Sequence, residues 1–196
     1  MSKLRRRAVV KQLLEGRENL LVVAGLGAPA WDITAAGDHD LSFPMWGAMG
    51  GAAMIGLGLA LAQPRKHVLV VTGDGEMLMG VGALATIAVM KPRNLSVVVL
   101  DNERYGETGM QETHTGHGVD LAGMAEAAGF ARAMKVTSAA QVAQMKKRVY
   151  AGEGPFLAQV KIDAEKLPLV LPPREGSYLK NRFRVALLGP DAVHDE

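Results

Sequence analysis

Two short polar stretches, each placed directly after an apolar run, carry the residue types with the greatest chemical potential. The apolar run 67–71 leads into a Gly-Asp-Gly at 73–75, and the run 95–100 leads into an Asp-Asn pair at 101–102. If both runs are neighbouring parallel strands joined by a helix, their carboxyl ends lie at one edge of a sheet, where such sheets bind ligands. The glycines allow a tight turn and a close approach of the backbone to that ligand.

The oxygen atoms at this edge suit a divalent cation and a phosphate group. Asp74 offers a carboxylate oxygen and Asn102 an amide oxygen. Together with phosphate oxygens they would form the hard, oxygen-only site that Mg²⁺ prefers. The next helix is expected to begin near Glu76, so its free N–H groups would point toward the same space and favour phosphate.

The two stretches together resemble the thiamine diphosphate motif, which is usually a Gly-Asp-Gly and a later Asn-Asn. Asp101 stands in place of the first Asn, and Asn102 matches the second, a metal ligand in that family. The resemblance implies that Asp74 and Asn102 are the side-chain ligands of Mg²⁺, with the backbone carbonyl of Arg104 as the third protein ligand. Residues 100–115 are similar, more specifically, to sulfopyruvate and phosphonopyruvate decarboxylases, which usually have a small residue where Arg104 stands.

A second segment, Gly47 to Ala52, resembles the turn that holds the pyrimidine ring of the cofactor in this family. The match implies that the Gly47 carbonyl binds the amino group of the cofactor and that the Met49 N–H binds a ring nitrogen. The Met49 side chain would wedge between the two rings and bend the cofactor. The alternative for this segment is ordinary packing of a helix of small residues.

A third segment, 25–30, fits the dinucleotide pattern G-x-G-x-x-A after a strand. A dinucleotide site needs an acidic residue about twenty positions further on, at the end of a second strand. Asp38 and Asp40 come too early for this role. Under the thiamine interpretation the same loop forms one wall of the diphosphate pocket.

These three segments and the residues after Asn102 define the predicted site. The residues expected to bind thiamine diphosphate are Gly25, Leu26, Gly27, Gly47, Ala48, Met49, Gly73, Asp74, Gly75, Glu76, Asn102, Arg104, Tyr105, Gly106, Glu107 and Thr108.

Among the histidines, His114 is the candidate catalytic residue because it directly follows the Gln-x-Thr stretch that matches the decarboxylases. His39 is a second residue that could face the substrate. His114 and His117 lack the further ligands that a zinc site would need. The side chain of Arg104 either points into the pocket, where it could pair with a second acidic group of the substrate, or points outward.

Composition narrows the function classes. The 196 residues suit one domain, and the net charge of +2 implies no strong nucleic-acid-binding field. The absence of cysteine excludes disulfides and thiolate chemistry and fits a cytoplasmic protein. The arginine cluster 5–7 is interpreted as a solvated helix face. The uncharged stretch 41–63 contains a proline and five glycines, so we expect a buried, closely packed helix rather than a membrane span.

Strands alternate with helices along the chain, which predicts an α/β fold with a doubly wound parallel sheet covered by helices on both faces. Strands are expected at 20–24, 42–46, 67–71, 95–100, 131–136 and 156–162. Helices are expected from a cap at Ser2 to 16, then at 31–36, 49–62, 76–90, 120–129 and 138–150. Residues 1–165 are expected to form the thiamine diphosphate-binding domain, and 166–196 a wrapping C-terminal tail.

The resemblance also identifies what a complete enzyme would require beyond this chain. In the family, a glutamate from a separate pyrimidine-binding domain activates the cofactor, and these 196 residues leave no room for such a domain. The expectation is therefore a β-type subunit of a 2-oxo acid decarboxylase, in a hetero-oligomer of at least α2β2 with an α-type pyrimidine-domain chain. The alternatives are a subunit of a carboligase or oxo-acid oxidoreductase with the same cofactor, or a non-catalytic scaffold partner.

Overall fold

The central strands of the main sheet are mainly apolar because helices cover both of their faces. The computed structural model describes residues 3–193 and contains a six-stranded sheet in the order β2-β1-β3-β4-β8-β7, with every neighbouring pair parallel. The strands are β1 (Leu21–Ala24), β2 (Ser42–Pro44), β3 (Val68–Gly73), β4 (Leu95–Asp101), β7 (Arg132–Val136) and β8 (Phe156–Lys161). The predicted doubly wound α/β fold is confirmed.

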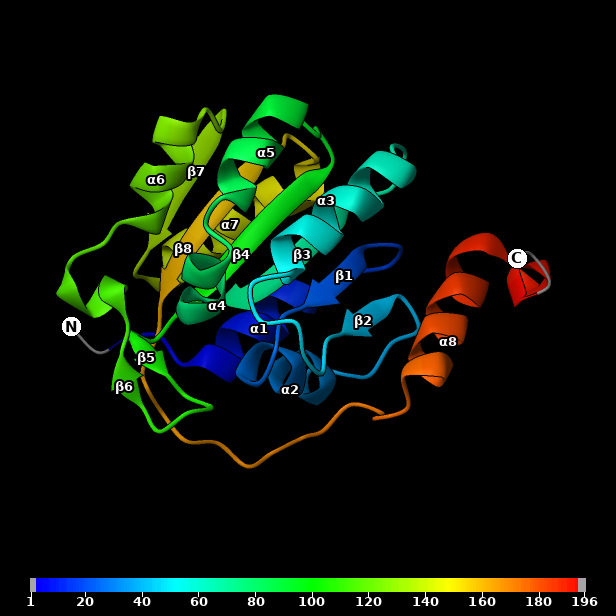
Figure 1. Cartoon of the computed structure of the whole chain (residues 1–196), viewed down its shortest axis with the longest axis horizontal. Helices are drawn as coiled ribbons and strands as arrows, with labels where there is room; N and C mark the ends of the chain where they lie inside the picture. The colour runs from blue at the N-terminus through cyan, green and yellow to red at the C-terminus, as the bar shows by residue number, and fades with distance from the viewer. Residues whose placement is uncertain (1–2, 194–196) are drawn as a thin grey trace.

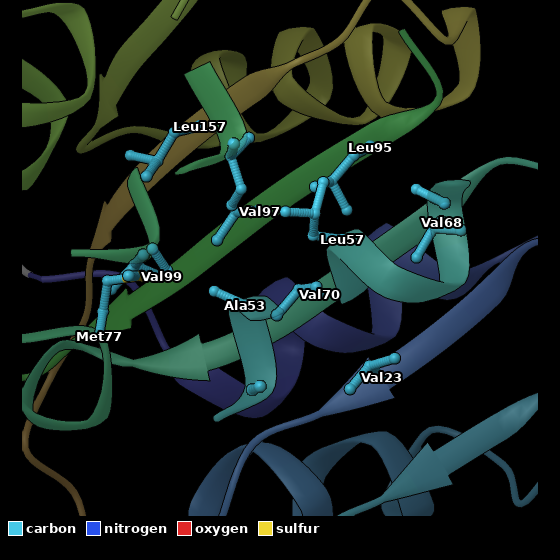
Figure 2. Close-up of a cluster of buried hydrophobic side chains, with 14 of the residues drawn as sticks. Val23, Ala53, Leu57, Val68, Val70, Met77, Leu95, Val97, Val99 and Leu157 are labelled. Atoms are coloured by element: carbon cyan, nitrogen blue, oxygen red, sulfur yellow. The ribbon is translucent and has the colours of Figure 1, made fainter. Parts of the chain in front are cut away.

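Successive side chains of each strand point to opposite faces, so the sheet separates two hydrophobic clusters. Val23, Val70, Val97 and Leu157 belong to the cluster on one face, which Figure 2 shows together with side chains of α3 (Ala52–Ala62). α5 (Ala83–Met90) and α6 (Leu121–Ala128) cover the same face (Figure 1). The helices of the other face are α1 (Arg6–Leu14), α2 (Ala28–Ala35) and α7 (Ala139–Ala151).

The predicted single helix over 76–90 is wrong, because the structure has two helices there. α4 (Asp74–Met79) already includes the aspartate of the Gly-Asp-Gly motif, and α5 begins only at Ala83. The break follows from close backbone packing at Gly80, where an added Cβ would lie 2.1 Å from the carbonyl oxygen of Gly50. The helix predicted from residue 49 likewise begins later, since Ala48 and Gly50 have positive φ angles of 57° and 96°.

The arginine cluster is not a solvated helix face. Arg6 is buried, and both Arg6 and Arg7 form ion pairs with the fully buried Asp32 of α2. These ion pairs fix α1 against α2 beside the carboxyl edge of the sheet. The expected cap at Ser2 lies outside the described residues; α1 begins after Arg5.

The C-terminal segment contains a helix that the sequence did not indicate. After β8 the chain runs extended past α2 and then forms α8 (Gly176–Leu188), followed by a short 3₁₀ turn at Pro190–Val193 (Figure 1). The ring of Phe183 packs edge-on against Phe43 of β2, with centroids 5.8 Å apart. A bidentate bond from Arg182 to Asp38 holds the same helix.

Residues 103–118, which connect β4 to α6, contain local secondary structure. They form a hairpin of β5 (Arg104–Tyr105) and β6 (Gln111–Glu112), followed by a 3₁₀ turn at His114–His117. In the part of the chain from residue 3 to 193, every helix falls short of the length and apolarity needed to cross a bilayer.

Candidate functional site

The two polar stretches leave the sheet side by side. Gly73 at the end of β3 pairs in register with Leu100 of β4, so Asp74 and Asn102 emerge at the same carboxyl edge. Both residues line a cavity of about 580 Å³, a volume within the usual range for small-molecule sites. The predicted residues in its lining are Leu26, Met49, Gly73, Asp74, Gly75, Glu76, Asn102, Arg104, Tyr105, Gly106, Glu107 and Thr108.

The other predicted residues, Gly25, Gly27, Gly47 and Ala48, are not in the lining of this cavity. A Cβ at Gly25 would collide with the Glu76 carboxylate, and a Cβ at Gly27 would lie 2.5 Å from Glu107 Oε1. These two glycines therefore allow glutamates of the lining to approach the first loop. Gly47 and Ala48 belong to the turn that presents Met49 but are not themselves in the lining.

The Asp74 carboxylate accepts a hydrogen bond from the hydroxyl group of Thr113. The side chain of Asp74 is only 1% exposed, and Thr113 Oγ1 lies 2.5 Å from its Oδ2. Thr115 Oγ1 lies 3.0 Å from the same Oδ2 but closer, 2.7 Å, to Asp101 Oδ1. Because each hydroxyl has one proton, the shortest contacts assign Thr113 as donor to Asp74 and Thr115 as donor to Asp101.

The electrostatic environment of Asp74 favours a cation. Burial raises the pKa of Asp74, and the negative charge of Asp101 raises it further, although the bond from Thr113 lowers it. A divalent ion at this carboxylate would offset both the burial and the repulsion. Residues 3–193 contain no group of three or more His, Cys, Asp or Glu placed for a metal. A metal here would therefore need amide and backbone oxygens beside the carboxylate.

Asn102 and Arg104 form a compact turn at the start of the hairpin. Asn102 Oδ1 accepts a hydrogen bond from the Arg104 N–H at 3.0 Å, while Glu103 takes a positive φ of 63°. The Arg104 guanidinium donates to Glu112 Oε1 at 2.8 Å and to the Glu103 carbonyl at 3.1 Å. The guanidinium is thus paired with Glu112 across the hairpin, while Arg104 also lines the cavity.

Asp101 belongs to a buried polar cluster that was not predicted from the sequence. It is fully buried and accepts hydrogen bonds from Gln159 at 2.6 Å and Thr115 at 2.7 Å, and it pairs with Lys161 at 2.8 Å. Lys161 also bonds Glu103, and the bonds from Lys161 and Lys3 lower the pKa of Glu103 to about 2. The sequence feature that could have revealed this cluster is the pair Gln159 and Lys161, two positions apart in the otherwise apolar strand β8.

Two close approaches bring the backbone segments of the site together. A Cβ at Gly75 would lie 2.5 Å from the Tyr105 ring, so the hairpin can cover the Gly-Asp-Gly turn only because residue 75 is glycine. The contact of Gly80 with Gly50 holds the turn around Met49 against the end of α4.

The histidines considered in the sequence analysis, His39, His114 and His117, are not among the residues that line the cavity. His114 is exposed on the 3₁₀ turn and is not among the lining residues, so its catalytic role stays a prediction. His39 Nδ1 accepts a bond from the Leu41 N–H at 3.0 Å, and burial lowers the pKa of His39. His117 Nε2 lies 3.2 Å from a Glu112 oxygen.

Comparison with known proteins agrees with this geometry. The family described as "Thiamine pyrophosphate enzyme, C-terminal TPP binding domain" matches residues 28–160. The sulfopyruvate decarboxylase subunit beta of Methanocaldococcus jannaschii is 41% identical over 122 residues, which cover 62% of this chain and 64% of that protein. The phosphonopyruvate decarboxylase of Streptomyces viridochromogenes is 36% identical over 186 residues, which cover 94% of this chain and 46% of that protein.

The chain therefore spans less than two thirds of the length of these curated relatives. Among solved structures, benzoylformate decarboxylase from Polynucleobacter necessarius superposes with a TM-score of 0.70 at 21% identity, over 85% of this chain and 34% of that one. That likeness shows the fold. From the family match and the cavity between the two motifs, we conclude that this chain belongs to the thiamine pyrophosphate enzymes, through their C-terminal TPP-binding domain.

Proposed function

We propose that this chain is the diphosphate- and Mg²⁺-binding β-type subunit of a thiamine diphosphate-dependent 2-oxo acid decarboxylase. The observation that carries the proposal is the meeting of Asp74 and Asn102 at one edge of the sheet, in a single cavity. Asp74, Asn102 and the carbonyl of Arg104 would hold Mg²⁺, which would bridge to the diphosphate. The oxygen-only character of this set fits Mg²⁺.

We assign further roles to the segments and residues around this site. Residues 1–165 would form the cofactor-binding domain, and the tail 166–196 would wrap it. The tail residues Lys166, Leu167 and Leu169 line the cavity. Met49 would separate the two rings of the cofactor. When bound, thiamine diphosphate would supply the carbanion-stabilising chemistry that decarboxylation of a 2-oxo acid requires.

The substrate and the partner are proposed from the relatives. Two are named as decarboxylases of sulfopyruvate and phosphonopyruvate, so we propose a three-carbon 2-oxo acid bearing a sulfonate or phosphonate. One of them is named as a subunit beta, which supports the existence of a partner chain. We propose that this partner is an α-type chain with the pyrimidine-binding domain, in at least an α2β2 assembly. The cavity rim supports such a partner, because Met79 lines it while 61% exposed.

The test combines calorimetry with product analysis. Thiamine diphosphate should bind only when Mg²⁺ is present, and more tightly when the candidate α-type chain is added. The complex should then release CO₂ from sulfopyruvate or phosphonopyruvate faster than from pyruvate. Carboligated products, or CO₂ release only with an electron acceptor, would indicate the related cofactor classes instead. No cofactor binding in the presence of the partner would leave a scaffold role.

A further inference from the structure

Glu76 is a buried carboxylate that is expected from the sequence among the cofactor-binding residues but is not one of the proposed Mg²⁺ ligands. It lies in the first turn of α4, is 4% exposed and lines the cavity. Its Oε2 accepts hydrogen bonds from the Leu26 N–H at 3.0 Å and from Thr72 Oγ1 at 2.8 Å. The side chain thus ties α4 to the first loop, the proposed diphosphate wall.

The first loop is shaped to receive this carboxylate. A Cβ at Gly25 would lie 2.0 Å from Glu76 Oε2 and 2.9 Å from Thr72 Oγ1. No side chain can occupy that space while Glu76 keeps its position. Gly25 has a negative φ, so the requirement for glycine at residue 25 comes from this contact and not from its backbone conformation.

α4, which carries Glu76, packs at its end on the turn around Met49, where a Cβ at Gly80 would lie 2.1 Å from the Gly50 carbonyl oxygen. Burial raises the pKa of Glu76, and hydrogen bonding from Thr72 and the Leu26 N–H, with smaller effects of the Ala52 and Gly50 N–H groups, acts in the opposite direction. Ala52 is the first residue of α3, whose N-cap is Gly51 and has no side chain to contribute. Glu76 Oε1 is buried and lacks a hydrogen-bond partner within residues 3–193. A carboxylate at a helix N-terminus is favourable, and here it lies between α3 and the first loop.

We propose that Glu76 is a positioning residue that braces the Leu26 loop against the turn 47–51 and so fixes the separation of the diphosphate and pyrimidine ends of the cleft. This inference deepens the proposed function and rests on it for the naming of those two ends. The brace itself is a property of the chain without cofactor, so it can be tested separately.

The first experiment measures amide hydrogen exchange in the full chain without cofactor, for Glu76→Ser and Glu76→Gln. Serine is too short to reach either segment, so exchange should accelerate both at 25–30 and at 47–52. Glutamine keeps an oxygen for Leu26 and Thr72 but presents N–H groups to the N-terminus of α3. It should therefore accelerate exchange at 47–52 alone. Glu126→Gln, on the exposed face of α6, is the matched control and should change neither segment.

The second experiment is a double-mutant cycle on the Gly25 contact, read by urea unfolding. Gly25→Ala should destabilise the wild-type chain but cost much less in the Glu76→Ser background, since the colliding carboxylate is gone. Equal costs in both backgrounds, together with unchanged exchange at both segments, would overturn the brace. If Glu76→Ser does not fold, the Gln variant and the Gly25→Ala variant still decide the exchange result.

Cofactor binding then separates this inference from the proposed function. With Mg²⁺ present, Glu76→Ser should weaken thiamine diphosphate binding by about tenfold, a loss comparable to one hydrogen bond to a charged group. The Gln variant should fall between Ser and wild type. If the wild-type chain with its partner does not bind the cofactor, the proposed function fails, whereas the exchange and stability results still judge the brace.

Discussion

Replacing Thr115 by valine tests the polar network that supports Asp74. Thr115 is 3% exposed, and its hydroxyl lies 2.7 Å from Asp101 and 3.0 Å from Asp74. Valine has nearly the same shape, so the substitution creates no cavity. The substitution removes the single hydrogen bond that the Thr115 hydroxyl can donate, and the geometry assigns this bond to Asp101.

The expected cost follows from this assignment. A hydrogen bond to a charged group contributes about 1.5–3 kcal/mol, and Asp101 keeps its bonds from Gln159 and Lys161. We therefore expect Thr115→Val to lower the free energy of unfolding by about 2 kcal/mol. For a chain of this size that corresponds to a fall in Tm of about 4–8 °C. In an Asp101→Asn background the acceptor is uncharged, and the cost should shrink to about 1 kcal/mol.

The assay is urea and thermal unfolding followed by circular dichroism. Thr137→Val is the matched control, because its exposed hydroxyl bonds only Gln141 at 3.1 Å. That control should stay within about 0.5 kcal/mol of wild type. A Thr115→Val variant as stable as the control would refute the assignment of its proton to Asp101. An undiminished cost in the Asp101→Asn background would refute the charge-assisted part of the reasoning.

Two further predictions concern the helices around the site. Gly56 and Gly58 both lie inside α3, but a Cβ at Gly56 would be 2.1 Å from Val70 whereas one at Gly58 meets nothing within 4 Å. Gly58→Ala should thus raise the free energy of unfolding by about 0.5–1 kcal/mol, and Gly56→Ala should lower it by about 1–3 kcal/mol through overpacking; equal signs in urea unfolding would contradict this packing. The Arg182–Asp38 pair should show a double-mutant coupling of about 1 kcal/mol at neutral pH. Because the bond from Arg182 holds the pKa of Asp38 below its ordinary 3.8, the coupling should be complete above that pH and vanish as the pH falls through the lowered pKa; a coupling that persists in strong acid would argue against an ionic contact.

Much of the fold could be predicted because its central strands are nearly continuous apolar runs. β3 and β4 are buried on both faces, and their ends are marked by glycine and polar residues. The break between α4 and α5 could not be predicted, since the apolar character continues across it. Its cause is a contact between Gly80 and the distant Gly50, which local sequence does not reveal. α8 was missed because its contacts, such as Phe183 on Phe43, are also long-range.

The residues of the site likewise differ in whether the local sequence reveals their role. Asp74 and Asn102 could be identified because each directly follows a strand. The groups that hold the acidic residues of the site could not, because Thr113, Thr115 and Gln159 come from a loop and from β8. The role expected of the arginine cluster failed for a similar reason. Its partner, Asp32, is on another helix and is itself fully buried.

Asp74 is the carboxylate that we propose as a ligand of Mg²⁺ beside the cofactor's diphosphate. The decisive measurement is calorimetric titration of thiamine diphosphate, with and without Mg²⁺, into the complex with the candidate α-type chain, for wild type and Asp74→Asn. Asp163→Asn, at an exposed position after β8, serves as the control. We predict Mg²⁺-dependent binding in wild type and control and its loss in Asp74→Asn. Equal, Mg²⁺-dependent affinity in all three proteins would contradict the proposed metal site.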